Sequence, residues 1–195
     1  MTIKVGVLAL QGDFAEHITM LSNLGVEAIE VRLPKDLASL HGLIIPGGES
    51  TTISRLINQW KLFQPICEHA AKGMGIWGTC AGAILLAERG ADLVQHKGLQ
   101  LMDITILRNV FGRQINSFVI ELNFPAIGEQ PFSAVFIRAP IITEVGSKAK
   151  ALVFLDDGTI VAAQQGKLLA TSFHPELTDD NRFHKYFLEL ITRVK

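Results

Sequence analysis

The sequence predicts an α/β fold with three layers, α/β/α, in which a mostly parallel central sheet carries antiparallel additions. Two observations predict it. In the first half of the chain, short apolar runs alternate with segments of helical periodicity, as expected when crossover helices join parallel strands. In the second half, strand-like runs follow one another with only turns between them, which favours antiparallel pairing.

The first half begins with a strand over residues 3–10, followed by a helix whose apolar positions end at Gly25. Residues 26–33 and 42–45 are the next two strands, and the turn Pro46-Gly47-Gly48 comes after them. The helix that follows could be capped by Ser50, Thr51 or Thr52. A further helix over 62–71, a buried strand over 74–79 and a helix over 81–89 complete a doubly wound unit. Such units place ligand sites at the carboxyl ends of their strands.

The second half contains six strand-like runs, at 99–108, 114–123, 134–138, 149–155, 160–165 and 167–173. Asp157-Gly158 and Gln165-Gly166 indicate tight hairpins between the last three runs. An apolar stripe at helical spacing over 183–194 predicts a final helix that packs on the sheet.

The composition of the chain excludes several classes of protein. The 195 residues fit one domain, 1–195, and 48% of them are hydrophobic, which excludes disorder. A net charge of −1 gives no electrostatic footprint for nucleic acid or for an anionic membrane. No segment has the ~18 consecutive apolar residues that a membrane span needs, and the apolar stretch 5–10 is too short for a cleaved leader. We therefore expect a cytoplasmic protein without cofactor or metal.

A reactive cysteine is predicted at Cys80. Residues 78–82, Gly-Thr-Cys-Ala-Gly, have the pattern of a nucleophile elbow with cysteine in place of serine, at the point where a strand meets a helix. The flanking glycines permit a sharp turn, and the N–H groups at the start of the helix would favour a thiolate. A buried cysteine in a tight turn is the alternative. Cys67 has no such surroundings, and we expect it in the core or on a helix flank.

The thiolate needs a proton carrier, and among the six histidines His174 has an evident partner. In an extended segment residues i and i+2 point to the same side, so Glu176 can accept from one imidazole nitrogen while the other faces the thiol. Pro175 favours the extended form. A loop histidine beside an exposed glutamate is the alternative. The remaining histidines have no evident partner and are expected on the surface or in helices: His17, His41, His69, His96 and His184.

Further motifs follow in a fixed order along the chain: Pro46-Gly47-Gly48-Glu49-Ser50-Thr51-Thr52, Arg108-Asn109 with Phe111-Gly112-Arg113-Gln114, Ser117-Phe118, Phe136-Ile137-Arg138-Ala139-Pro140, and Ser172-Phe173-His174-Pro175-Glu176-Leu177-Thr178. Together with the cysteine elbow they resemble the class I, triad-type glutamine amidotransferase family. Within it, they are similar to the pyridoxal 5'-phosphate synthase glutaminases. The likeness runs from Val5 to the last helix.

The resemblance implies a class I glutamine amidotransferase fold and a Cys80-His174-Glu176 triad that hydrolyses L-glutamine to L-glutamate and ammonia. It implies a glutamine site at Gly48, Glu49, Ser50, Arg108, Ile137 and Arg138. Backbone N–H groups of Gly48 and Ala81 could form the oxyanion hole. The implied partner is the synthase subunit, which takes the ammonia for pyridoxal 5'-phosphate (vitamin B6) synthesis and organises the oxyanion hole. Gln11-Gly12 lies where contact could couple the two proteins, or is a plain turn.

Two other functions share these features. A related cysteine hydrolase, such as a gamma-glutamyl peptidase, would have the same elbow, and a catalytically silent binding module would have the same fold. A dinucleotide site is disfavoured, although residues 73–78 match G-x-G-x-x-G. That fingerprint should follow a strand and open a helix, whereas here it precedes and occupies a predicted strand.

Overall fold

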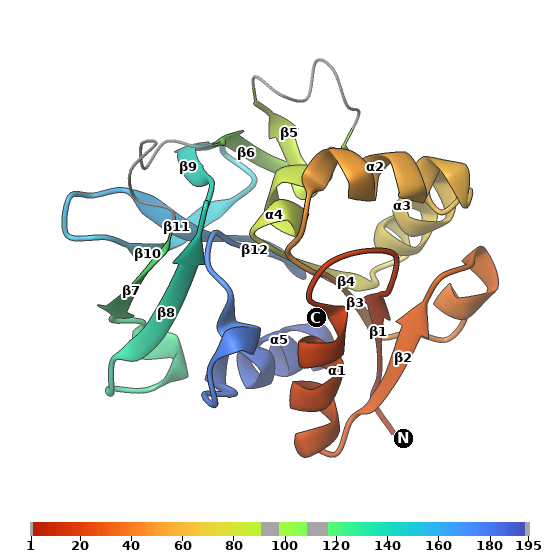
Figure 1. Ribbon diagram of the computed structural model, residues 1–195, viewed down its shortest axis with the longest axis horizontal. Helices are drawn as coiled ribbons and strands as arrows, with labels where there is room; N and C mark the ends of the chain where they lie inside the picture. Colours follow the sequence, from red (N-terminus) through yellow and green to blue (C-terminus); the bar gives the residue numbers. More distant parts are fainter. Residues whose placement is uncertain (1, 91–97, 109–116, 194–195) are drawn as a thin grey trace.

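The computed structural model describes residues 2–90, 98–108 and 117–193. Within these ranges a ten-stranded sheet forms the centre of the molecule (Figure 1). Its strands, in spatial order, are β2 (Glu27–Val31), β1 (Lys4–Leu8), β3 (Gly42–Ile45), β4 (Gly75–Thr79), β12 (Leu168–Thr171), β11 (Ile160–Gln165), β9 (Ile141–Val145), β6 (Met102–Leu107) and β5 (Ala87–Arg89), with β10 (Lys150–Phe154) paired to β11. A separate antiparallel hairpin consists of β7 (Ser117–Leu122) and β8 (Phe132–Ile137).

The sheet is mixed, as the sequence predicts. From β2 to β12 neighbouring strands run parallel, and β11 and β9 are then added antiparallel. The hairpins predicted at Asp157-Gly158 and Gln165-Gly166 are confirmed, since β10, β11 and β12 pair antiparallel in sequence. The pairing of β4 with β12 brings Thr79 opposite Thr171, so the chain segments that follow these two residues leave the same edge of the sheet.

Helices cover both faces of the sheet, which confirms the three layers. Alternate residues of one strand enter different cores: Leu43 and Ile45 join one apolar cluster, whereas Ile44 joins the other. The first cluster contains residues of α2 (Ser50–Gln59), α3 (Phe63–Ala71) and α4 (Ala81–Leu86). The second contains residues of α1 (Phe14–Asn23) and α5 (Arg182–Thr192). None of the helices in the described ranges has the length and apolar character needed to cross a bilayer.

Two elements differ from the prediction. The helix predicted over 81–89 ends at Leu86, and the next three residues form β5, parallel to β6. Arg89 is a good helix former, but its side chain donates to Thr105 and Asp103 of β6, so tertiary contacts decide its conformation. Strand β9 was not predicted, because it is short and four of its five residues are partly buried or exposed.

Candidate active site

Cys80 lies in the turn between β4 and α4, with an unusual backbone φ of 48°. The turn is possible because both flanking residues lack a side chain. A Cβ at Gly82 would lie 2.0 Å from the carbonyl oxygen of Ile45, and one at Gly78 would lie 2.4 Å from the backbone of Gly82. Neither approach is possible for any residue but glycine. The elbow expected from residues 78–82 is therefore present, with Cys80 as the last residue before the helix.

His174 and Glu176 follow β12 in a short segment that leaves the same sheet edge. Nδ1 of His174 lies 2.7 Å from Oε1 of Glu176, so the predicted contact is present. Its predicted cause is wrong: residues Pro175–Leu177 form a 3₁₀ helix, η4, rather than an extended segment. The fixed φ of Pro175 suits the first position of a helical turn, which folds Glu176 back onto the imidazole. Both side chains are buried.

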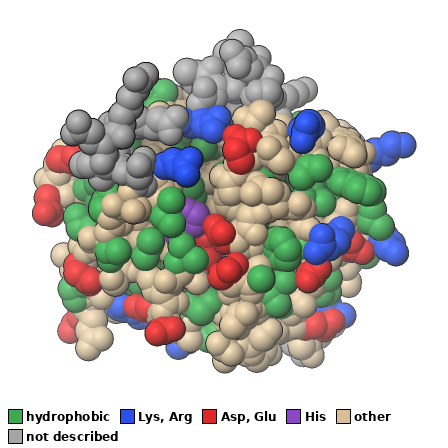
Figure 2. Space-filling view, in the orientation of Figure 1, with side chains coloured by type: hydrophobic (Ala, Val, Ile, Leu, Met, Phe, Trp, Pro, Cys, Tyr) green, Lys and Arg blue, Asp and Glu red, His purple; other side chains and the backbone are tan. Residues whose placement is uncertain are grey.

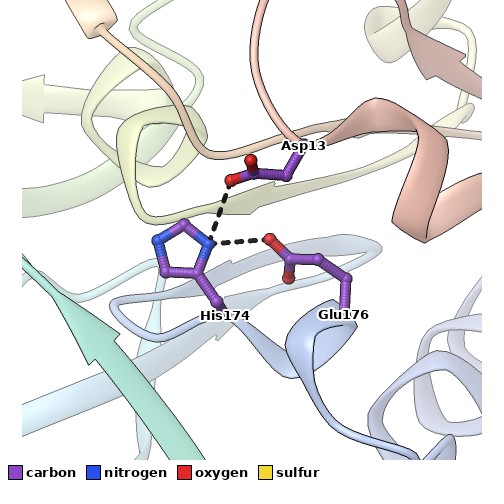
Figure 3. Close-up of side chains that lie close together, drawn as sticks. All are labelled: Asp13, His174 and Glu176. Carbon is purple, nitrogen blue, oxygen red and sulfur yellow. Dashed lines mark hydrogen bonds and ion pairs between the residues drawn. The ribbon is translucent and has the colours of Figure 1, made fainter. Parts of the chain in front are cut away.

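A second carboxylate, which the sequence did not single out, faces the same nitrogen. Oδ2 of Asp13, in the loop before α1, lies 3.4 Å from Nδ1 of His174. Figure 3 shows both carboxylates on one side of the ring, with the other ring nitrogen pointing away from them. A Cβ at Gly47 would lie 2.2 Å from Cε1 of His174, so this glycine makes room for the ring. The one signal in the sequence was the position of Asp13 just after the first strand.

Electrostatics favour an imidazolium at His174. Burial lowers its pKa, but the interactions with the Cys80 thiol and the Glu176 carboxylate outweigh burial and raise the pKa to about 10. Burial raises the pKa of Glu176, against the opposing effect of His174. Burial also raises the pKa of Asp13, while His174 lowers it. The arrangement therefore holds a proton on His174 at neutral pH.

Asp13, His174 and Glu176 each place one potential ligand atom within 4.8 Å of the others, a spacing that a metal ion could use. However, Nδ1 of His174 and Oε1 of Glu176 are 2.7 Å apart, which is a direct hydrogen bond. Two atoms that each lay ~2 Å from an ion between them would be farther apart than this. The three residues therefore suit proton handling better than metal binding.

A cavity of about 500 Å³ opens beside Cys80 and His174. Each residue predicted for glutamine binding or for the oxyanion hole lines it, and Gln11, Asp13 and Ile84 are added: the full lining is Gln11, Asp13, Gly48, Glu49, Ser50, Cys80, Ala81, Ile84, Arg108, Ile137, Arg138 and His174. Glu176 lies behind His174, outside the lining. In the orientation of Figure 1, a small histidine patch is visible with acidic side chains beside it and basic side chains above it (Figure 2). Residues 109–116 of the predicted motifs, and His96, lie outside the described residues.

One wall of the cavity carries a pair of opposite charges. Glu49 caps α2 by accepting from the N–H groups of Thr51 and Thr52, so the cap predicted at Ser50, Thr51 or Thr52 was wrong by one residue or more. Burial raises the pKa of Glu49, but these hydrogen bonds outweigh it and lower the pKa to about 2. An ion pair of 3.2 Å joins Glu49 to Arg108. The carboxylate of Glu49 and the guanidinium of Arg108 thus lie side by side. Such a pair can bind the ammonium and the carboxylate of an amino acid.

Two histidines have partners that the sequence did not reveal. His17 and His184 lie in helices α1 and α5, which agrees with the expectation of surface or helix positions, but both are fully buried and lie 3.0 Å apart, Nδ1 to Nε2. Their partners come from helices at opposite ends of the chain, which no local pattern reveals. His41 accepts from the backbone N–H of Lys4, so it also has a partner. Cys67 is part of α3 and packs against the core, as predicted.

Comparison with known proteins places the chain in a family. Residues 7–193 match the SNO glutamine amidotransferase family. The chain is 60% identical over 190 residues to a pyridoxal 5'-phosphate synthase subunit PdxT from Herpetosiphon aurantiacus, covering 96% of this chain and 100% of the relative. It is 54% identical over 194 residues to the PdxT subunit of Dehalococcoides mccartyi, covering 99% and 100%.

Solved structures agree with these sequence matches. A crystal structure of a glutamine amidotransferase superposes with a TM-score of 0.91 at 46% identity, covering 96% of this chain and 98% of the other. The structure of PurLQS from Thermotoga maritima shares the fold, with a TM-score of 0.69 at 17% identity, covering 98% and 100%. The chain belongs to the SNO glutamine amidotransferase family.

Proposed function

We propose that this chain is the glutaminase subunit of pyridoxal 5'-phosphate synthase. It hydrolyses L-glutamine to L-glutamate and ammonia and delivers the ammonia to the synthase subunit. The observation that carries this proposal is the meeting of three groups: Cys80 on its glycine elbow, His174 lining the same cavity, and Glu176 hydrogen-bonded at 2.7 Å behind the imidazole. Nucleophile, proton carrier and orienting carboxylate are the parts that a cysteine amidohydrolase needs.

The mechanism assigns each group a step. The Cys80 thiolate attacks the side-chain amide carbon of glutamine. The backbone N–H groups of Gly48 and Ala81 stabilise the oxyanion, and Ala81 suits this role because the first N–H groups of a helix have no partner within it. The His174 imidazolium gives its proton to the leaving nitrogen, so ammonia departs and a glutamyl thioester remains. His174 then takes a proton from water, which attacks the thioester and releases glutamate and the thiolate.

The charged wall supports recognition of a free amino acid. Arg108 and Arg138 can hold the α-carboxylate of glutamine, and Glu49 can hold its ammonium group. In the structure Arg108 pairs with Glu49, so a bound zwitterion would exchange this contact for one with each of its own charges. Ser50 and Ile137 complete the pocket. A substrate that lacks either the α-carboxylate or the ammonium group would leave Arg108 or Glu49 without a contact to the substrate.

A partner and a location follow from the chemistry. Ammonia is mostly protonated at neutral pH and is then no nucleophile, so transfer inside a complex protects it. Neither Cys67 nor Cys80 forms a disulfide. A reactive thiol persists in a reducing compartment, which supports the cytoplasm as the location.

The first experiment measures glutamate and ammonia released from glutamine by the chain in complex with the synthase subunit. Cys80→Ala should lower kcat by roughly 10⁴-fold or more, as loss of a triad nucleophile does. Cys67→Ala is the matched control and should retain wild-type activity, because Cys67 lies on α3, away from the cavity lining. Near-wild-type activity of Cys80→Ala would overturn the mechanism. Activity restricted to γ-glutamyl peptides would favour a peptidase, and inactivity of the wild-type complex would favour a binding module.

A second comparison tests the partner. Glutaminase activity is measured with and without the synthase subunit, at equal concentrations of the chain. We expect a rise in kcat on adding the subunit, because it organises the oxyanion hole around Gly48. The side chain of Gln11 already accepts from the N–H of Glu49 at 2.8 Å, which links the loop after β1 to this backbone. Full activity of the isolated chain would contradict the coupling.

A further inference from the structure

Behind the triad lies a pair of histidines that the proposed mechanism does not use. His17, on α1, and His184, on α5, are fully buried. Nδ1 of His17 lies 3.0 Å from Nε2 of His184, and Nε2 of His17 lies 3.3 Å from Oγ1 of Thr79. The ring of Trp77 makes edge-to-face contacts with both imidazoles, at centroid distances of 5.7 and 5.0 Å. Packing therefore fixes where each ring nitrogen points.

The triad carboxylate has one oxygen without a donor. Oε1 of Glu176 bonds to His174, whereas Oε2 is buried and makes no hydrogen bond within the described part of the chain. A buried carboxylate oxygen left without a donor destabilises the charged form. Nε2 of His17 lies 3.4 Å from this oxygen, so a small movement brings the two into hydrogen-bond range.

The tautomer of His17 decides whether its Nε2 can donate. A neutral imidazole carries its proton on one nitrogen, and the other nitrogen accepts. With the proton on Nδ1, His17 would donate to His184 and turn a lone pair toward Glu176. The proton of His184 would then sit on its own Nδ1, which is buried and has no partner among the described residues. This tautomer has two unfavourable features: a lone pair that faces the carboxylate, and a buried N–H group of His184 without a hydrogen-bond partner among the described residues.

With the proton on Nε2 of His17, neither unfavourable feature arises. His184 donates from its Nε2 to Nδ1 of His17, and the Nε2–H of His17 faces the hydroxyl of Thr79 and the carboxylate of Glu176. A charged carboxylate attracts an N–H group more strongly than a neutral hydroxyl does. The contacts of the pair thus favour the tautomer that can donate to the triad.

From this geometry we infer that His17 is a positioning residue, whose Nε2–H donates to Oε2 of Glu176 and so holds the carboxylate that orients His174. The inference rests on the proposed glutaminase function. It extends the hydrogen-bonded chain from Cys80, His174 and Glu176 to His17 and His184, and links the triad to helices near both ends of the sequence. A carboxylate held at both oxygens keeps the imidazole aimed at the thiol.

The two buried histidines add no charge to the site. The titratable groups facing His17 are Glu176 and His174 from the segment after β12, and His184 from α5. Burial and then the neighbouring His184 and His174 lower the pKa of His17 well below 6.5. Burial lowers the pKa of His184 to about 4. Both rings are therefore neutral at physiological pH and act as hydrogen-bond donors and acceptors.

The test compares His17→Gln with His17→Asn in the complex with the synthase subunit. Both variants place an amide at this position, but Gln reaches as far as Nε2 of histidine, whereas Asn reaches only as far as Nδ1. We expect His17→Asn to lower kcat by about 10- to 100-fold, by analogy with the loss seen when the hydrogen-bond partners of metal-bound side chains are removed. The KM for glutamine should not change, because no contact to substrate is lost. His17→Gln should restore most of the lost kcat.

The pH profile separates positioning from a general loss of structure. Loss of the N–H donor raises the pKa of Glu176 further, so the acidic limb of kcat should move to higher pH in His17→Asn but not in His17→Gln. Phe187→Leu serves as the packing control: it trims an equally buried ring that contacts Trp77 and leaves the hydrogen bonds of His17 and His184 in place, so the acidic limb should stay where it is. Thermal unfolding of each variant measures the structural cost.

Three results would overturn the inference: wild-type kcat in His17→Asn, equal losses in His17→Asn and His17→Gln, or a shifted acidic limb in Phe187→Leu. Failure of the glutaminase function itself looks different. In that case the wild-type complex would release no ammonia, and the His17 variants would have no activity to compare.

Discussion

Two carboxylates face the same nitrogen of His174, and they differ in distance and in burial. Glu176 is buried and lies 2.7 Å from Nδ1, whereas Asp13 is 3.4 Å from the same nitrogen and 38% of its side chain is exposed. Solvent screens an exposed charge more than a buried one, so Glu176 should dominate the protonation of His174 and Asp13 should adjust it. The pKa of His174, about 10, lies above its ordinary 6.5. His174 is therefore fully protonated at neutral pH and loses its proton only as the pH rises toward 10.

Replacement of Asp13 by Asn should lower the pKa of His174, because a nearby negative charge stabilises the imidazolium. Glu176→Gln should lower it by more than Asp13→Asn. NMR titration of the His174 ring measures both shifts, and the alkaline limb of kcat should move to lower pH in the same order. An unchanged His174 titration in Asp13→Asn would show that the 3.4 Å contact carries no electrostatic interaction.

The sequence predicted the residues whose partners are close along the chain or belong to a recognisable motif. Glu176 is two residues from His174, and Cys80 has its own glycine pattern. His17 was missed because its partner His184 is 167 positions away. Asp13 was missed because its role depends on the approach of a loop from the other half of the chain. Such contacts exist only once the sheet has formed.

The elbow between β4 and α4 shows why glycine is required at two places. Gly78 and Gly82 face each other across the turn, and Gly82 also touches the backbone of β3 at Ile45. The contacted atoms belong to the backbone, which cannot move aside as a flexible side chain can. The close approach fixes Cys80 at the start of the helix. Loss of either glycine should therefore affect both folding and the position of the thiol.

Gly82→Ala should destabilise the protein by ~1–3 kcal/mol, since an added methyl group in a filled space forces the backbone apart. It should also lower kcat. Gly25→Asn is the matched control, because Gly25 has φ of 71° and no atom within 4 Å of an added Cβ. Asparagine tolerates that conformation, so its cost should stay within ~0.5 kcal/mol. Urea unfolding gives both values, and equal stabilities would contradict the close approach.

At the scale of elements, hydrophobic periodicity predicted most of the strands and helices. The elements that it missed depend on contacts with distant parts of the chain. Residues 87–89 were predicted as helix but form β5, which pairs with β6. Residues 175–177 were predicted as extended but form the 3₁₀ helix η4. β9 was absent from the prediction, although it joins β11 to β6. In each case pairing with a distant strand, or packing around the site, outweighed the local preference of the residues.

At the scale of the whole molecule, the two halves of the chain meet within the central sheet, where β12 pairs with β4 and β6 pairs with β5. β12, from the last third of the chain, pairs with β4 from the first half, and this pairing brings Cys80 and His174 to the same sheet edge. The backbone N–H of Cys80 donates to the carbonyl of Thr171 at 2.8 Å, which continues the ladder into the elbow. The apolar cluster around Trp77 likewise contains residues from both halves. Neither half contains a complete active site.

For this reason we expect residues 1–195 to unfold as one domain. Separation of β12 from β4 would expose Trp77, which is fully buried, together with Phe173 and Phe187 of the same cluster. Exposing such large side chains costs about 2 kcal/mol or more each, so a half-folded state should not accumulate. Urea transitions followed by tryptophan fluorescence and by far-ultraviolet circular dichroism should coincide. Loss of glutaminase activity in the complex should not precede them. Two separated transitions would show instead that the parallel and antiparallel halves are independent units, and the triad would then be assembled by docking of two domains.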